Sequence, residues 1–299
     1  MTKRRVRRVT PAVRKKNVKR KNVAGKKTGA RSAGTRPRPK ARSAGVASRS
    51  ESGKYVYCVI QSRASLDFGP IGVGSDSSRV HTVNYKELAA VVSETPMGVK
   101  DPTRENILAH QRVNETVMRD QSVLPMSFGT VFKTHDDIVE LLRSAYDAFT
   151  DVLGKMRGNI ELGLKVLWDP GQIVRQIESE EEDIMRLKAE ISSRSGSTYF
   201  ARMQYGRLIE AAMHARSERY VSEIFEGLRP VSVAARANKP IGDRMIMNGA
   251  FLVSLNQEAA FDKQVKALGR RYSHLTFKYT GPWPPYNFVN IRLKLERAD

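Results

Sequence analysis

The side chains that could perform metal or acid–base chemistry are few and scattered. The histidines are His81, His110, His135, His214 and His274. No two of them are four residues apart and none has a cysteine partner, so the spacing of an ordinary zinc site is absent. The acidic run at residues 178–183 would point around a helix axis and could not converge on one cation. We therefore expect no metal site and no cofactor.

Motifs for nucleotide binding and covalent catalysis are also incomplete. The glycines of Gly72-Val73-Gly74 lack the third glycine and the following helix of a dinucleotide fingerprint. A Walker-A spacing and a G-x-S-x-G elbow are absent as well. His110 falls on the apolar stripe of a predicted helix, which favours a core or interface histidine over a general base. The sequence thus predicts a protein that is not an enzyme.

The basic charge is concentrated at the N-terminus. The formal net charge is +21, and the first 50 residues hold 19 Lys plus Arg with no Asp or Glu, which leaves +2 for the rest. Residues 1–52 also lack aromatic side chains, so we expect a disordered basic tail. Its candidate polyanion-binding residues are Arg4, Arg5, Arg7, Arg8, Lys15, Lys16, Lys19, Arg20 and Lys21. Two interpretations stay open, a nucleic-acid-binding or regulatory segment and an arm that keeps the protein soluble or docks on a protein partner.

The expected location is the cytoplasm. Cys58 is the only cysteine, which excludes an intrachain disulfide, and neither a secretory apolar segment nor a run of about 18 apolar residues occurs. An organellar transit peptide would also be rich in arginine. The tail lacks the leucine and phenylalanine spacing that makes such peptides amphipathic, so a soluble cytoplasmic protein without membrane insertion is favoured.

The first half of the chain after the tail predicts an α+β domain over residues 53–158. Expected strands are residues 54–60, 80–83, 88–93 and 123–132. Asp101-Pro102 is expected to begin a helix that reaches about Gln121. Thr134 and Asp137 form a variant capping box before a second helix that ends near Gly158, where we place the domain boundary.

The second half, residues 159–299, predicts a domain with a long helical hairpin at residues 170–226. Expected strands are residues 160–168, 231–235, 246–255 and 275–279, and a further helix is expected at residues 258–271. The resulting order β-α-β-β-α-β is that of a ferredoxin-like unit in which the hairpin replaces the first helix. Candidate partner-binding residues on the hairpin are Ile177, Ile184, Tyr199, Met203, Met213, Tyr220 and Ile224.

The segment GPWPPYNFV at residues 281–289 combines three prolines with three aromatic side chains. The prolines prevent regular strand pairing, so we expect an extended edge segment. A clamp in which Trp283, Tyr286 and Phe288 close the sheet or the domain junction is favoured over an exposed peptide. The structural signature residues of the segment are Trp283, Pro284, Pro285 and Tyr286.

These blocks resemble the gas vesicle GvpL/GvpF family. The resemblance rests on GPWPPYNFV together with GAFLV, LPMSFGTVF, the lone His110, AVVS, YVYCVI and STYFARM, and it covers about residues 53–299. It implies a two-domain α+β protein whose C-terminal domain is a modified ferredoxin fold. It further implies a non-enzymatic accessory or minor structural role in gas vesicles, with contacts to the hydrophobic shell subunit and to other accessory proteins. The 52-residue basic extension departs from the family pattern.

A physical mechanism follows as a hypothesis. A shell subunit that repels water on one face risks aggregation before it joins the wall. We expect this protein to bind unassembled shell subunits through an apolar surface on the helical hairpin and the cleft between its domains.

Overall fold

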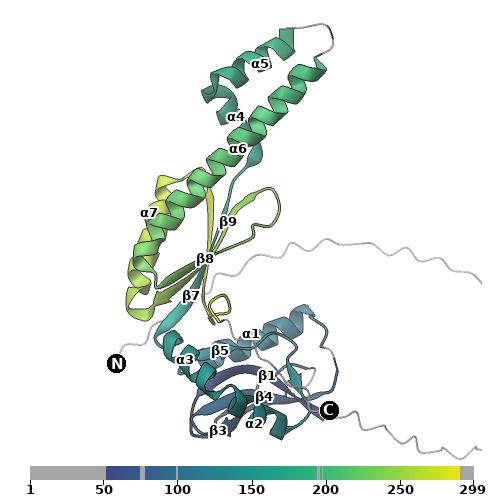
Figure 1. Cartoon of the computed structure of the whole chain (residues 1–299), viewed down its shortest axis with the longest axis vertical. Coiled ribbons are helices and arrows are strands. Elements are labelled where there is room, and N and C mark those ends of the chain that lie inside the picture. The colour runs from purple at the N-terminus through teal and green to yellow at the C-terminus, as the bar shows by residue number, and fades with distance from the viewer. Residues whose placement is uncertain (1–51, 75–77, 99, 194–195, 197, 290–299) are drawn as a thin grey trace, which may run out of the picture. The chain divides into compact units, whose positions relative to one another are not determined.

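Two antiparallel sheets with helices packed against them form the described part of the chain, which makes the fold class α+β (Figure 1). The computed structural model describes residues 52–74, 78–98, 100–193, 196 and 198–289. These residues all belong to the unit Ser48–Asp299. The basic tail expected at residues 1–52 lies outside the described residues except for Ser52.

The first sheet is built around a buried central strand. Its strands are β1 (Ser52–Gln61), β2 (Asp67–Pro70), β3 (Arg79–Tyr85), β4 (Leu88–Pro96), β5 (Val123–Pro125) and β6 (Val131–Phe132). They follow the order β2-β3-β4-β1-β5, and β6 also pairs with β1. Six consecutive residues of β1, Tyr55 to Ile60, are fully buried, because helices cover both faces of the sheet.

Two sequence expectations for this sheet need correction. The strand expected at residues 123–132 consists of the two short strands β5 and β6, since the backbone turns between them at Gly129, which has a φ of 85°. Strand β2 was not expected, because two of its four residues are glycine and proline.

Helices cover both faces of this sheet. On one face, α1 (Arg104–Met118) contributes Val113 and Val117 to a cluster with Tyr55 and Tyr57. On the other face lie α2 (His135–Ser144) and α3 (Tyr146–Met156). The N-cap of α1 is Thr103, whose hydroxyl accepts from the Asn106 N–H, and not Asp101 as the sequence suggested.

The expected helix over residues 134–158 is in fact two helices. The chain leaves helical geometry at Ala145, with φ −107° and ψ 17°. The capping box at its start is confirmed: Thr134 Oγ1 accepts from the Asp137 N–H at 3.1 Å, and Asp137 Oδ2 accepts from the Thr134 N–H at 2.9 Å.

We expect Thr134→Ala to lower the free energy of unfolding by about 1 kcal/mol, because two N–H groups of the first turn lose their reciprocal caps. Urea denaturation followed by circular dichroism measures this change. Thr150→Ala is the control, since the Thr150 hydroxyl bonds only to the Tyr146 carbonyl inside α3. Equal losses in the two variants would contradict the capping argument.

The second sheet has the order β10-β7-β9-β8, with every neighbouring pair antiparallel. Its strands are β7 (Asn159–Leu167), β8 (Ala234–Asn238), β9 (Met245–Ser254) and β10 (Thr276–Trp283). Helix α7 (Glu258–Arg271) matches the predicted helix and connects β9 to β10. Leu164, Phe251 and Phe261 are fully buried at the centre of the core between this sheet and its helices.

Three helices lie between β7 and β8. They are α4 (Pro170–Glu180), α5 (Glu182–Ser193) and α6 (Tyr199–Leu228), and α4 and α5 run along one side of α6 (Figure 1). The sequence predicted one helix where α4 and α5 stand. The chain instead bends at Glu181, whose ψ of 106° is extended. The acidic run lies at this bend, where Glu178 pairs with Lys188 and Glu180 pairs with Arg216.

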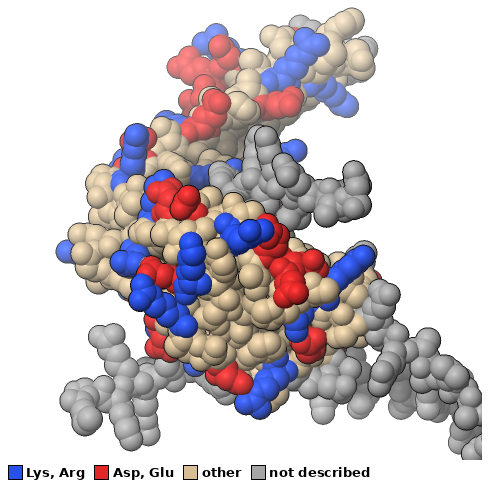
Figure 2. Space-filling model, turned by 60° about the horizontal axis from the view of Figure 1, so that its bottom comes forward, with Lys and Arg blue, Asp and Glu red and all other residues tan. Residues whose placement is uncertain are grey.

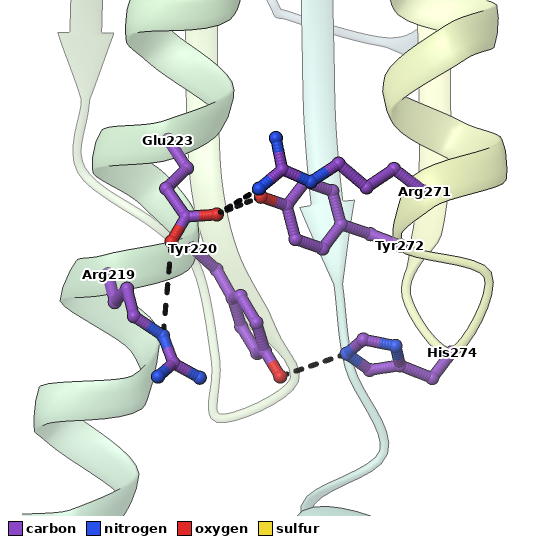
Figure 3. Close-up of polar contacts among 6 residues, drawn as sticks. All are labelled: Arg219, Tyr220, Glu223, Arg271, Tyr272 and His274. Carbon is purple, nitrogen blue, oxygen red and sulfur yellow. Dashed lines mark hydrogen bonds and ion pairs between the residues drawn. The ribbon is translucent and has the colours of Figure 1, made fainter.

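A polar cluster fixes the base of α6 to the connection between α7 and β10 (Figure 3). Its members are Arg219, Tyr220, Glu223, Arg271, Tyr272 and His274. Glu223 accepts hydrogen bonds from Tyr272 and from Arg271, and it lies 4.0 Å from Arg219. The Tyr220 hydroxyl lies 3.0 Å from His274 Nε2. Because the Glu223 carboxylate of α6 bonds to two residues at the end of α7, this cluster is a structural anchor for α6.

Candidate functional site

The last described residues, 283–289, form a closing segment that contacts both sheets. Strand β10 ends with a register shift, after which Trp283 pairs with Glu161 of β7. Gly281 has a φ of 122°, and a Cβ at this position would lie 3.0 Å from the Glu161 carbonyl oxygen. Pro284 and Pro285 are buried and Trp283 is half-buried. Three of the four signature residues, Trp283, Pro284 and Pro285, therefore lie against the fold, whereas the fourth, Tyr286, is exposed.

Tyr286 extends from the closing segment to α1 on the first sheet. Its hydroxyl lies 3.0 Å from His110 Nε2 and accepts from Asn114 Nδ2 at 3.0 Å. The other ring nitrogen of His110 lies 2.9 Å from the hydroxyl of Tyr55, which accepts from the Gly129 N–H. Although 41% of Tyr286 is exposed, the hydroxyl is directed inward to this network. The network spans 176 residues of sequence between His110 and Tyr286.

Burial sets the protonation states in this network. It lowers the pKa of His110 to about 4, and a hydrogen bond to the Met126 carbonyl opposes this shift. It also raises the pKa of Tyr55 to about 12 and raises that of Tyr286. His110 is therefore neutral near pH 7. His110 lies between the hydroxyls of Tyr55 and Tyr286, the position of a core or interface histidine.

Asn287 holds the closing segment to the second sheet. Its backbone N–H donates to Glu161 Oε2 at 2.8 Å and its side chain donates to Glu161 Oε1 at 2.6 Å. Arg236 of β8 donates to the Asn287 carbonyl at 2.9 Å. Burial raises the pKa of Glu161, against the two hydrogen bonds from Asn287. Two adjacent residues, Tyr286 and Asn287, thus anchor the segment to different sheets.

A hollow of about 520 Å³ lies beside the closing segment. Its apolar lining includes Met118, Val123, Met156, Ile160, Leu255 and Pro285. Its polar lining consists of Glu115, Arg119, Asp120, Gln121, Ser122 and Asn159. The hollow is therefore of mixed character, and its two methionines can adapt to the shape of a bound group.

The structure separates the candidate residues of the helical hairpin into two groups. Ile177, Ile184, Tyr220 and Ile224 are buried in the core cluster, and Met213 packs against it. Tyr199 and Met203 are exposed, by 66% and 39%. This second group is exposed to solvent, whereas Met213 is only partly buried. The partner-binding role of the whole set stays a prediction.

The exposed pair gains one neighbour that the helical pattern did not indicate. Phe200 is 77% exposed and stacks edge-on against Tyr199 with 5.5 Å between ring centroids. We call Tyr199, Phe200 and Met203 the hairpin tip, since they lie in the first two turns of α6. The adjacent Tyr-Phe pair was the available signal, but a helical pattern alone does not say which face has a partner.

The described residues contain no group of three or more His, Cys, Asp or Glu that could hold a metal ion. Within the same part of the chain, no helix is both long and apolar enough to cross a membrane. The candidate polyanion-binding residues between Arg4 and Lys21 lie outside the described residues. On the face shown in Figure 2, acidic and basic side chains are interspersed, so that face carries no broad basic surface for nucleic acid.

Comparison with known proteins identifies the family. A family model described as gas vesicle synthesis protein GvpL/GvpF matches residues 53–290. The chain belongs to the GvpL/GvpF family. Gas vesicle protein F2 of Halobacterium salinarum is 31% identical over 252 residues, which cover 83% of this chain and 97% of that protein. Gas vesicle protein F1 of the same organism is 29% identical over 246 residues, which cover 81% of this chain and 95% of that protein.

Solved GvpF structures share the fold. The crystal structure of GvpF from Anabaena sp. PCC7120 matches with a TM-score of 0.71 and 24% identity, over 81% of this chain and all of that one. The crystal structure of GvpF from Microcystis aeruginosa matches with a TM-score of 0.66 and 22% identity, over 80% of this chain and 99% of that one. The GvpL/GvpF match confirms the family resemblance in the sequence and gives this chain a gas vesicle-related role.

Proposed function

We propose that this protein is an accessory or minor structural component that binds the hydrophobic shell subunit and other gas vesicle proteins during vesicle assembly. The observation that carries the proposal is the hairpin tip, where two aromatic rings and one methionine are exposed within the first two turns of α6. Aromatic residues and methionine are enriched in protein interfaces, and an exposed apolar cluster is unfavourable unless a partner covers it. The protein acts at the gas vesicle without a catalytic step.

The hollow beside the closing segment supplies a second contact. Its apolar lining can take one anchoring side chain of the partner, as interface hot spots commonly do. An extended apolar ligand held at two separated points gains affinity by increased effective concentration. Release at a growing vesicle edge then requires only that these two weak contacts be exchanged for contacts within the shell.

The domain organisation that serves this function is residues 53–158 and 159–299, with the hairpin at residues 170–226 inserted in the second domain. The change from the first sheet to the second between α3 and β7 supports this boundary. The strand order β10-β7-β9-β8 supports a modified ferredoxin-like domain. In this arrangement the sheet is the rigid support and the hairpin is the interaction arm.

The test measures how well the protein keeps the shell subunit from aggregating. Light scattering of diluted shell subunit should stay low with the native protein, and Tyr199→Ser/Phe200→Ser should lose most of this protection because it removes the exposed rings. Val233→Ser/Ile241→Ser is the matched control, since these side chains are exposed by 61% and 73% elsewhere. Full protection by the Tyr199/Phe200 variant, or equal loss in both variants, would reject the tip as the binding surface.

A further inference from the structure

The outer face of α6 has no partner among the described residues. It consists of Arg207, Ala211, His214, Ala215 and Glu218, all of them exposed. The opposite face of the same helix supplies Ile209, Tyr220 and Ile224 to the core. A shallow hollow of about 440 Å³, lined by four of the outer-face residues and Glu210, lies at the middle of the helix.

This face carries a positive charge, Arg207, toward one end and a negative charge, Glu218, toward the other, so it is complementary to an antiparallel copy of itself. Within the described part of the chain no carboxylate lies within ion-pair distance of Arg207, whereas Glu218 lies 3.4 Å from His214 one turn away. Arg207 and Glu218 are separated by three helical turns and are equally far from the point between Ala212 and Met213. A second helix of the same sequence, rotated by 180° about that point, would place each arginine opposite a glutamate.

We propose that two copies of this chain associate through the outer face of α6, with the two helices antiparallel. Arg207 of each copy then faces Glu218 of the other, and Ala211 faces His214. A parallel arrangement would instead place like charges against each other, which is unfavourable. Such a two-fold contact uses the same surface on both copies, as most homodimers do.

The shape of the face agrees with this arrangement. Ala211 and Ala215 have short side chains, so a second helix can approach to the 8–10 Å typical of packed helices. The contact spans only about three helical turns, which is small for a stable dimer. The association is therefore weak and concentration-dependent, and salt weakens it because its two ion pairs are solvent-exposed.

Sedimentation equilibrium of the full chain tests the proposal. The mean mass should rise from the monomer value of 33.6 kDa toward twice that value as protein concentration increases, and less so in about 500 mM salt than in about 50 mM salt. Arg207→Glu and Glu218→Arg should each remain monomeric, because each variant places like charges opposite one another. An equimolar mixture of the two variants should recover the dimer, since every facing pair is then opposite in charge.

Lys263→Glu on α7 is the control, because it makes the same charge change at an exposed residue outside this face and should dimerise as the native chain does. Circular dichroism verifies that each variant is folded. A native chain that stays monomeric at all concentrations overturns the proposal, and so does a mixture that fails to associate. Protection of the shell subunit should be unchanged in Arg207→Glu, so the outcome is distinct from that of the hairpin-tip test.

Discussion

Replacing Tyr286 by alanine should lower the free energy of unfolding by about 3 kcal/mol. The substitution removes the ring and leaves the side chains of His110 and Asn114, which are buried, without the hydroxyl they share. Asn114 Nδ2 and His110 Nε2 remain 3.1 Å apart, so the expected cost combines the lost hydrogen bonds to the phenol, about 1 kcal/mol each, with the lost packing of the ring. Urea denaturation followed by tryptophan fluorescence measures the change, with Trp283 close to the site.

Two further variants separate the causes. Tyr286→Phe keeps the ring and should lower the free energy of unfolding by about half as much as Tyr286→Ala, because only the hydrogen bonds are lost. Tyr279→Ala is the matched control: Tyr279 is exposed by 37%, close to the 41% of Tyr286, but its hydroxyl bonds to the exposed Asp262. If Tyr286→Ala destabilises the protein no more than Tyr279→Ala, the closing segment does not fasten the fold.

Acidification from pH 7 to pH 4 should destabilise the protein by about 3 kcal/mol through His110 alone. The ordinary histidine pKa of 6.5 applies to the unfolded chain, whereas burial lowers the pKa of the folded state to about 4. Between these values the unfolded chain binds a proton that the folded chain does not. Stability is therefore unaffected by His110 above pH 6.5 and falls as the pH drops toward 4.

Glu161 should change the stability with pH in the direction opposite to His110. Its folded-state pKa is raised, so the folded chain holds a proton more readily than the unfolded chain just above pH 4.5, and acidification there favours folding. His110→Gln should flatten the pH dependence of the urea midpoint, whereas Glu161→Gln should steepen it. Identical pH profiles in the native protein and His110→Gln would contradict the buried neutral histidine.

Much of the fold could be predicted because local signals agreed with tertiary packing. The apolar run at residues 54–60 became the central strand β1, and the Thr134 capping box starts α2. Helix α7 matches its prediction at both ends. In each case the residues that set the local geometry also supply the buried face, so periodicity and capping are sufficient.

The breaks at Ala145 and Glu181 could not be predicted, because each falls inside a continuous helical pattern and no proline or glycine marks it. The same limit applies to the hairpin. Its apolar spacing marks side chains that can be buried, but the pattern cannot distinguish those packed within the chain from those open to a partner. Ile177 and Ile224 belong to the first kind and Tyr199 to the second.

The closing segment has a consequence for synthesis on the ribosome. His110 and Asn114 emerge long before Tyr286, and the 176 residues between positions 110 and 286 take about 10–35 s to translate at typical speeds. During that interval the first sheet can form while its buried imidazole and amide still lack the phenol that completes them. A prematurely terminated chain keeps this defect permanently, so incomplete products should be recognisable to proteases by their looser first sheet.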